Sequence, residues 1–167
     1  MKLFVRCSTT WAIAAALSVG AVSTATAQNF NTAPTQVVSA NPFGIMLEFF
    51  NAEYEHTAGE SFTIGVGGSI FTSDNDTYRN LDAFWRFYPE ETGGPFRGWS
   101  FGLKAGVTNL NAKTYIGAGF DVDHSWLLGK NENFYVGLGF GLKRLLGDGD
   151  GLRIIPTVRL VNIGYAF

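Results

Sequence analysis

Two histidines, His56 and His124, are the side chains best suited to acid–base chemistry, because histidine titrates near neutral pH. A hydrolase or acyltransferase would need a serine within hydrogen-bond reach of one of them. Ser125 adjoins His124, but successive residues of a strand point to opposite faces, so these side chains diverge. Ser69 and Ser100 are expected on the face opposite the histidines. We therefore expect no catalytic residues.

Asp121 and Asp123 alternate along one predicted strand and so share a face, as paired catalytic carboxylates would. Lys104 and Lys143 are expected on the two flanking strands. Because buried carboxylates need basic partners, this arrangement favours a structural ion-pair cluster over a catalytic pair.

The segment 147–151, Gly-Asp-Gly-Asp-Gly, resembles a fragment of a calcium-binding loop. Calcium takes six to eight oxygen ligands, and the further ligands are missing here. The segment is therefore predicted to be a hairpin turn, and we expect neither a metal site nor a cofactor.

Short segments of alternating apolar and small or polar residues fill the chain from residue 37 onward, separated by Gly/Asn/Asp turn clusters. They predict an all-β fold, an eight-stranded antiparallel up-and-down barrel. A closed barrel with both termini at one end needs an even strand number, so a tight turn near Phe49-Phe50-Asn51 is expected to divide the first long segment. The predicted strands are 37–48, 50–57, 61–72, 78–88, 98–108, 113–127, 133–145 and 152–167.

One face of each predicted strand is large and apolar, whereas the other combines glycine with charge. In 98–108, Trp99, Phe101 and Leu103 oppose Gly102 and Lys104. Since a small barrel has just enough interior for side chains to fill it, the polar face is expected inside and the apolar face toward lipid. The alternative is a water-soluble barrel with an apolar ligand cavity. The expected interior charge network comprises Glu48, Glu53, Glu55, Asp82, Arg86, Lys104, Asp121, Asp123, Lys143 and Arg159.

The first 27 residues have the features of a cleavable signal peptide. Lys2 and Arg6 precede an apolar run, 11–22, that is too short to cross a bilayer as a helix, and Ala25-Thr26-Ala27 fits the cleavage pattern. We expect a signal peptide at 1–27, a short periplasmic lead-in at 28–36 and the barrel at 37–167. Cys7, the single cysteine, lies in the signal, so the mature chain has no thiol chemistry. With 14 acidic and 12 basic residues, the chain lacks a nucleic-acid footprint.

The end of the chain carries the most specific pattern. Val161, Ile163, Tyr165 and the terminal Phe167 alternate, and they resemble the C-terminal targeting signal of outer-membrane barrels, which the barrel assembly machinery recognises. The segment from Phe87-Tyr88-Pro89 through 99–103 also looks like a periplasmic hairpin of such barrels. From about residue 37 onward the chain resembles the OmpA-like and OmpX-like eight-stranded group. An aromatic girdle at the periplasmic rim is expected from Tyr54, Phe62, Trp99, Trp126 and Tyr165.

That resemblance implies a location in the bacterial outer membrane, with outer-membrane lipids and the assembly machinery as partners, and a monomer is expected. Two features depart from it: Pro156 lies inside the last strand, and Leu160-Val161 breaks the alternation, which predicts a bulge.

The expected role is structural or in surface interaction, without catalysis and without a continuous water path. The alternatives are a lipid A-modifying enzyme and a small-solute transport barrel. Transport is disfavoured because Phe84 and Tyr135, the large aromatics expected inside, would act as plugs.

Overall fold

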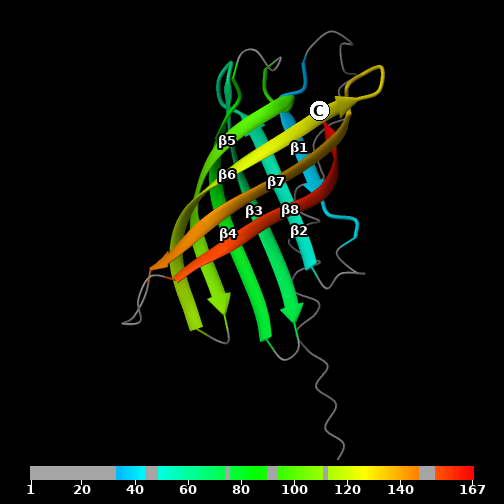
Figure 1. Ribbon diagram of the computed structural model, residues 1–167. Helices are drawn as coiled ribbons and strands as arrows, with labels where there is room; N and C mark the ends of the chain where they lie inside the picture. Colours follow the sequence, from blue (N-terminus) through cyan, green and yellow to red (C-terminus); the bar gives the residue numbers. More distant parts are fainter. Residues whose placement is uncertain (1–32, 44–48, 74–75, 90–93, 111–112, 147–152) are drawn as a thin grey trace, which may run out of the picture. The chain divides into compact units, whose positions relative to one another are not determined.

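The computed structural model is a closed barrel of eight strands (Figure 1). It describes residues 33–43, 49–73, 76–89, 94–110, 113–146 and 153–167, and Ala33–Phe167 form one compact unit. The predicted signal peptide (1–27) therefore lies outside the described residues, and so does the part of the predicted lead-in (28–36) up to position 32. The strands are β1 (Gln36–Ala40), β2 (Phe49–Thr57), β3 (Phe62–Ser73), β4 (Asp76–Phe87), β5 (Gly98–Leu110), β6 (Lys113–Leu128), β7 (Phe134–Leu146) and β8 (Arg153–Ala166).

Every strand pairs antiparallel with its neighbour in sequence, and β1 closes the barrel against β8. The predicted fold class and strand number are thus confirmed at the level of an all-β, eight-stranded antiparallel barrel. We call the end where β1 begins and β8 ends the terminal end, and the opposite end the loop end. Phe167 completes the closure, since its carbonyl oxygen accepts hydrogen bonds from the Thr35 and Gln36 amides, both 2.9 Å long.

Burial alternates along the strands as the sequence pattern predicts. In β4, Asp82, Phe84 and Arg86 are buried, whereas Leu81 and Trp85 between them are exposed. In the β4–β5 and β5–β6 registers, outward-facing residues pair with outward-facing residues and inward-facing residues with inward-facing ones. Each face of the sheet is therefore continuous across neighbouring strands.

The first turn lies earlier than the sequence indicated. Phe49, Phe50 and Asn51 were expected to form a tight turn, but they begin β2 and pair with β3. The chain turns instead after Asn41, whose side-chain oxygen accepts a 2.8 Å hydrogen bond from the Phe43 amide. Asparagine side chains stabilise such turns by bonding the backbone two residues on, and the following proline favours one.

The irregularity predicted near Leu160-Val161 is confirmed. The β7–β8 register shifts between Gly137, which pairs with Asn162, and Gly139, which pairs with Arg159. The extra residue of β8 leaves both Leu160 and Val161 on the exposed face. The bulge therefore preserves the burial of the flanking Asn162 and Arg159.

An apolar cluster occupies the terminal end of the barrel. Val37, Phe96, Tyr135 and Ala166 are each at most 1 % exposed and pack together. Tyr88 is fully buried beside them, with its ring centroid 6.3 Å from that of Phe96. Phe96 belongs to the β4–β5 connection, and it adopts a left-handed φ of 67°. Because that conformation costs an aromatic residue free energy, burial of the ring must offset it.

Among the described residues, no helix is long and apolar enough to cross a membrane.

Candidate functional site

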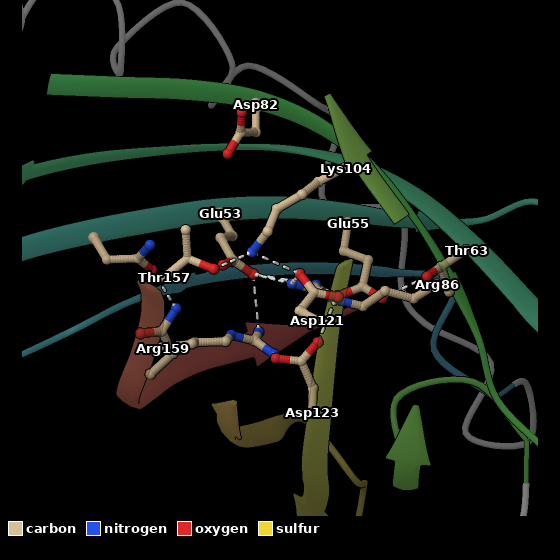
Figure 2. A network of polar contacts seen from close by, with 12 residues as sticks. Glu53, Glu55, Thr63, Asp82, Arg86, Lys104, Asp121, Asp123, Thr157 and Arg159 are labelled. Carbon is tan, nitrogen blue, oxygen red and sulfur yellow. Dashed lines mark hydrogen bonds and ion pairs between the residues drawn. The ribbon is translucent and has the colours of Figure 1, made fainter. Parts of the chain in front are cut away.

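Arg86 of β4 is the centre of a buried network of charged side chains (Figure 2). Its Nε donates a 2.9 Å hydrogen bond to Asp123 of β6, and its Nη1 donates one of 2.8 Å to Glu55 of β2. Nη2 lies 3.1 Å from Glu53 and 3.9 Å from Asp121. Arginine suits this place because its planar fork presents five donors in fixed directions. One side chain thereby links three strands.

Arg159 of β8 provides a second buried guanidinium. Its Nη2 lies 3.1 Å from Glu53, which it shares with Arg86, and donates a 2.7 Å hydrogen bond to the Tyr135 hydroxyl. Its Nη1 lies 3.7 Å from Asp123, which is too far for a hydrogen bond. Two guanidinium groups and the carboxylates between them therefore join β8 to β2, β4 and β6.

Lys104 and Lys143 continue the network toward the loop end. Lys104 Nζ lies 3.1 Å from Asp121 and donates a 2.7 Å hydrogen bond to Thr157. Lys143 Nζ pairs with Asp82 at 2.5 Å, and it also donates hydrogen bonds to Asn80 and Thr108. We expected both lysines to form ion pairs with Asp121 and Asp123. Lys143 pairs with Asp82 instead, because its side chain extends to β4.

Glu55 connects the network to the apolar cluster at the terminal end of the barrel. Its Oε1 accepts hydrogen bonds from Thr63, at 2.5 Å, and from the Tyr88 hydroxyl, at 2.8 Å. Burial, and secondarily the nearby Glu55 carboxylate, raise the pKa of the Tyr88 phenol well above its ordinary value. Tyr88 therefore stays protonated and keeps donating this hydrogen bond in neutral solution.

Glycine makes room for the carboxylates. A Cβ added at Gly102 would overlap the Asp121 side chain, and one added at Gly139 would overlap that of Asp123. At these two positions glycine is thus a packing requirement of the buried aspartates.

A cavity of about 80 Å³ adjoins the network on its loop-end side. Its lining includes Arg86 and Asp121, and it extends to Phe49 and Tyr78 near the loop ends of their strands. Residues 156–158 of β8 also contribute to its lining. The apolar cluster at the terminal end takes no part in the lining.

Nine of the ten charged residues expected in the interior network lie in the described part of the chain, and each of these takes part in an ion pair. The tenth, Glu48, falls outside the described residues. Of the two aromatics expected to act as plugs, Tyr135 is fully buried and Phe84 is 7 % exposed. The Arg86 guanidinium carbon lies 3.9 Å from the Phe84 ring centroid, so Phe84 belongs to the network rather than to the apolar cluster.

The histidines and serines are kept apart. The ring centroid of His124 lies 4.9 Å from that of Trp99 and 4.3 Å from that of Trp126. Within the described part, its Nδ1 has no hydrogen-bond partner. Ser125 is buried on the opposite face, and His56 is exposed. Ser125 and His124 therefore lie on opposite faces of β6.

The residues expected in the aromatic girdle are all exposed, and all lie within three residues of the terminal ends of their strands. They are Tyr54, Phe62, Trp99, Trp126 and Tyr165. The alternating residues of the C-terminal pattern are exposed as well, and the rings of Tyr165 and Phe167 stack with centroids 6.2 Å apart.

Sequence reasoning missed Tyr88 and Phe96. Tyr88 lay at the end of the predicted strand 78–88, two positions after Arg86, so the alternation indicated an inward direction for it. Phe96 lay between two predicted strands, where no alternation shows which way a residue faces. The available signal was the presence of large aromatics in a Gly/Pro-rich connection, where polar residues are usual.

Among the described residues, no group of three or more His, Cys, Asp or Glu side chains could hold a metal ion. In comparisons with known proteins, no family model, no curated protein and no solved structure matches the chain.

Proposed function

We propose that the chain is an integral outer-membrane β-barrel with a structural or surface-interaction role and no catalytic activity. One observation carries the proposal: the exposed face of the barrel is built of large apolar side chains. Leu103 is 62 % exposed, Ile116 65 % and Phe140 55 %, all on strands whose opposite face is made mostly of charged, hydroxyl-bearing and glycine residues. A continuous exposed apolar surface of this kind is typical of contact with lipid.

The dimensions fit a bilayer. Strands β3 to β8 contain 12 to 16 residues, more than the ~9–11 that a tilted strand needs to cross. The exposed Arg79 and Arg144 lie within three residues of the loop ends of β4 and β7. Exposed aromatics such as Trp99, Trp126 and Tyr165 lie at the terminal ends. Charge near one rim and aromatic rings at the other suit the two interfaces of a membrane.

The buried face supports a closed, polar, side-chain-filled interior rather than a channel. The Arg86 network links β2, β4, β6 and β8 by ion pairs, and the apolar cluster around Phe96 lies between this network and the terminal end. A solute would have to pass two layers, one ionic and one apolar, so small-solute transport is the weaker proposal. Lipids would be the main partners of the exposed face, with the barrel assembly machinery acting during insertion.

Lipid A modification is likewise a weaker proposal than the structural role. Such an enzyme needs a nucleophile and a base within hydrogen-bond reach. His124 packs between two tryptophans, and Ser125 faces away from it. Mass spectrometry of lipid A from a deletion strain tests this alternative, which predicts a changed acyl pattern.

The deciding experiment follows the protein in fractionated Gram-negative cells. We expect it in the outer-membrane fraction, with faster gel mobility when unheated than after boiling, because a closed barrel resists dodecyl sulfate until heated. Recovery in a soluble fraction, with an apolar ligand bound, would replace the proposal with the water-soluble carrier.

A further inference from the structure

The interior network has more acids than bases. In the described part of the chain, five carboxylates share it with four cations. The carboxylates are those of Glu53, Glu55, Asp82, Asp121 and Asp123, and the cations are Arg86, Lys104, Lys143 and Arg159. Asp82 and Lys143 balance each other, so the other four carboxylates share three cations. Because an uncompensated buried charge is strongly unfavourable, one of these four carboxyl groups is expected to bind a proton.

The two glutamates are well stabilised as carboxylates. Glu55 accepts hydrogen bonds from Arg86, Thr63 and the Tyr88 hydroxyl. Glu53 lies 3.1 Å from each of the two guanidinium groups, those of Arg86 and Arg159. Since hydrogen bonds to a charged carboxylate favour its ionised form, the extra proton is expected on one of the aspartates.

Asp121 and Asp123 receive fewer hydrogen bonds. Asp123 accepts one of 2.9 Å from Arg86 Nε, and its distance of 3.7 Å to Arg159 Nη1 is too long for a second. Asp121 Oδ2 lies 3.1 Å from Lys104 Nζ and 3.9 Å from Arg86 Nη2. Its other oxygen, Oδ1, is buried and has no hydrogen-bond partner in the described part of the chain. Asp121 therefore has an acceptor to which a neighbouring O–H could donate.

The two aspartates are neighbours inside the barrel. They lie two positions apart on the buried face of β6, and both approach Arg86 (Figure 2). Their carboxyl groups are within hydrogen-bond reach of each other. Two ionised carboxylates have no donor to offer one another, whereas a protonated carboxyl group can donate to an ionised one.

We propose that Asp121 and Asp123 form a proton-binding site, in which one proton is shared between the two carboxyl groups. The proton supplies the missing donor and leaves four negative charges against four positive ones in the network. Carboxylates that share a site cannot both ionise easily. The inference depends on the barrel interior alone, and it goes beyond the proposed membrane role.

The groups around the pair allow its proton to be assigned. The charged and titratable side chains that face it come from five other strands. They are Glu53 and Glu55 of β2, Arg86 of β4, Lys104 of β5, Tyr135 and Lys143 of β7 and Arg159 of β8. Side chains of these types do not ordinarily titrate between about pH 5 and pH 7. Proton uptake by the interior in that range is therefore assigned to the two aspartates.

The test follows the side-chain carboxyl carbons by NMR in the full mature chain in dodecylphosphocholine micelles. We expect Asp121 and Asp123 to take up one proton together between about pH 7 and pH 5, whereas an isolated aspartate titrates near pH 3.9. The exposed Glu60 is the internal control and should titrate near its ordinary value of about 4.3. If both aspartates stay ionised down to about pH 4, the proposal is wrong.

Two substitutions change the charge count in opposite directions. Asp121→Asn removes the extra carboxylate, so Asp123 should then stay ionised down to about pH 4. Lys104→Met removes a cation, so the midpoint of proton uptake should rise by about one pH unit or more. Thr157→Val is the matched control, because it removes the 2.7 Å hydrogen bond from Lys104 without changing the charge. Equal midpoints in Lys104→Met and Thr157→Val would contradict the proposal. The titration of the unmodified chain decides the question if a variant fails to fold.

A metal cation is the other species that could balance the network. Replacement of sodium by the larger tetramethylammonium ion at constant ionic strength should leave the midpoint unchanged. A midpoint that rises when sodium is removed would show that sodium occupies the site in place of the proton, and it would overturn the proposal.

Discussion

The Asn162 side chain of β8 donates a 2.7 Å hydrogen bond to the side-chain oxygen of Asn51 in β2. The two residues are 111 positions apart, and their strands are not neighbours, since β1 lies between them in the barrel. This buried amide pair therefore joins β2 to β8 just beyond the point where the short strand β1 ends.

Loss of this amide pair should weaken the closure of the barrel. Asn51→Ala is expected to lower the free energy of unfolding by about 1–3 kcal/mol, because it leaves the buried Asn162 amide unpaired. Urea unfolding in micelles measures the change. Asn109→Ala, which removes an exposed 3.2 Å hydrogen bond to Thr114, is the control and should have little effect. Equal effects of the two substitutions on the free energy of unfolding would show that the buried amide pair contributes no more to stability than the exposed hydrogen bond.

Removal of Arg86 should be the most destabilising single charge change in the network. Arg86→Met leaves the carboxylates of Glu53, Glu55 and Asp123 without this cation, and we expect a loss of about 3–5 kcal/mol. Addition of Glu55→Gln should restore part of that loss, because one uncompensated charge is removed. Arg153→Met is the control, since Arg153 is exposed. Unfolding curves in which Arg86→Met and Arg153→Met coincide would contradict the structural role.

The proposed membrane location predicts that an added charge costs most at mid-depth. Leu103 is 62 % exposed at the middle of β5, whereas Leu128 is 45 % exposed at the end of β6. Leu103→Arg should therefore cost about 2–4 kcal/mol in a bilayer and Leu128→Arg about 0–1 kcal/mol. Reversible unfolding from phospholipid vesicles measures both. If neither substitution lowers stability, the exposed face does not contact lipid.

Tyr88 should make the barrel sensitive to alkali. Burial raises its pKa above the ordinary value of 10.0, so the unfolded chain loses this proton at a lower pH than the folded chain. The contribution to stability is complete below pH 10 and declines as the pH rises further, by at most about 1.4 kcal/mol per pH unit. Urea unfolding at pH 8 and pH 11 should show a smaller loss for Tyr88→Phe than for the unmodified chain, with Tyr54→Phe as the control for an exposed tyrosine. A pH dependence unaffected by Tyr88→Phe would exclude this residue as its source.

The two closing layers predict a barrel that does not conduct. In planar bilayers the unmodified chain should give no stable channel, and neither should Phe96→Ala, because the Arg86 network still blocks the interior. A general porin is the positive control. Large, reproducible conductance steps from the unmodified chain would refute the closed interior.

Local patterns were enough to predict the strands and their two faces. Because side chains alternate along any strand, the facing of Arg86 and Leu103 could be predicted from their neighbours alone. The same reasoning located the bulge at Leu160-Val161, where the alternation slips by one residue. It could not locate the first turn, which depends on the hydrogen bond from the Phe43 amide to Asn41.

The sequence by itself determined the kind of molecule: eight alternating strands, with charge on one face and large apolar side chains on the other. Only the tertiary structure decided which charges meet, because the partners of Arg86 lie 31 to 37 positions away and are brought together by the stagger of strands around the barrel. The same holds for Phe96, whose inward direction no local period encodes. Alternation is a property of one strand, whereas pairing and closure depend on several strands at once.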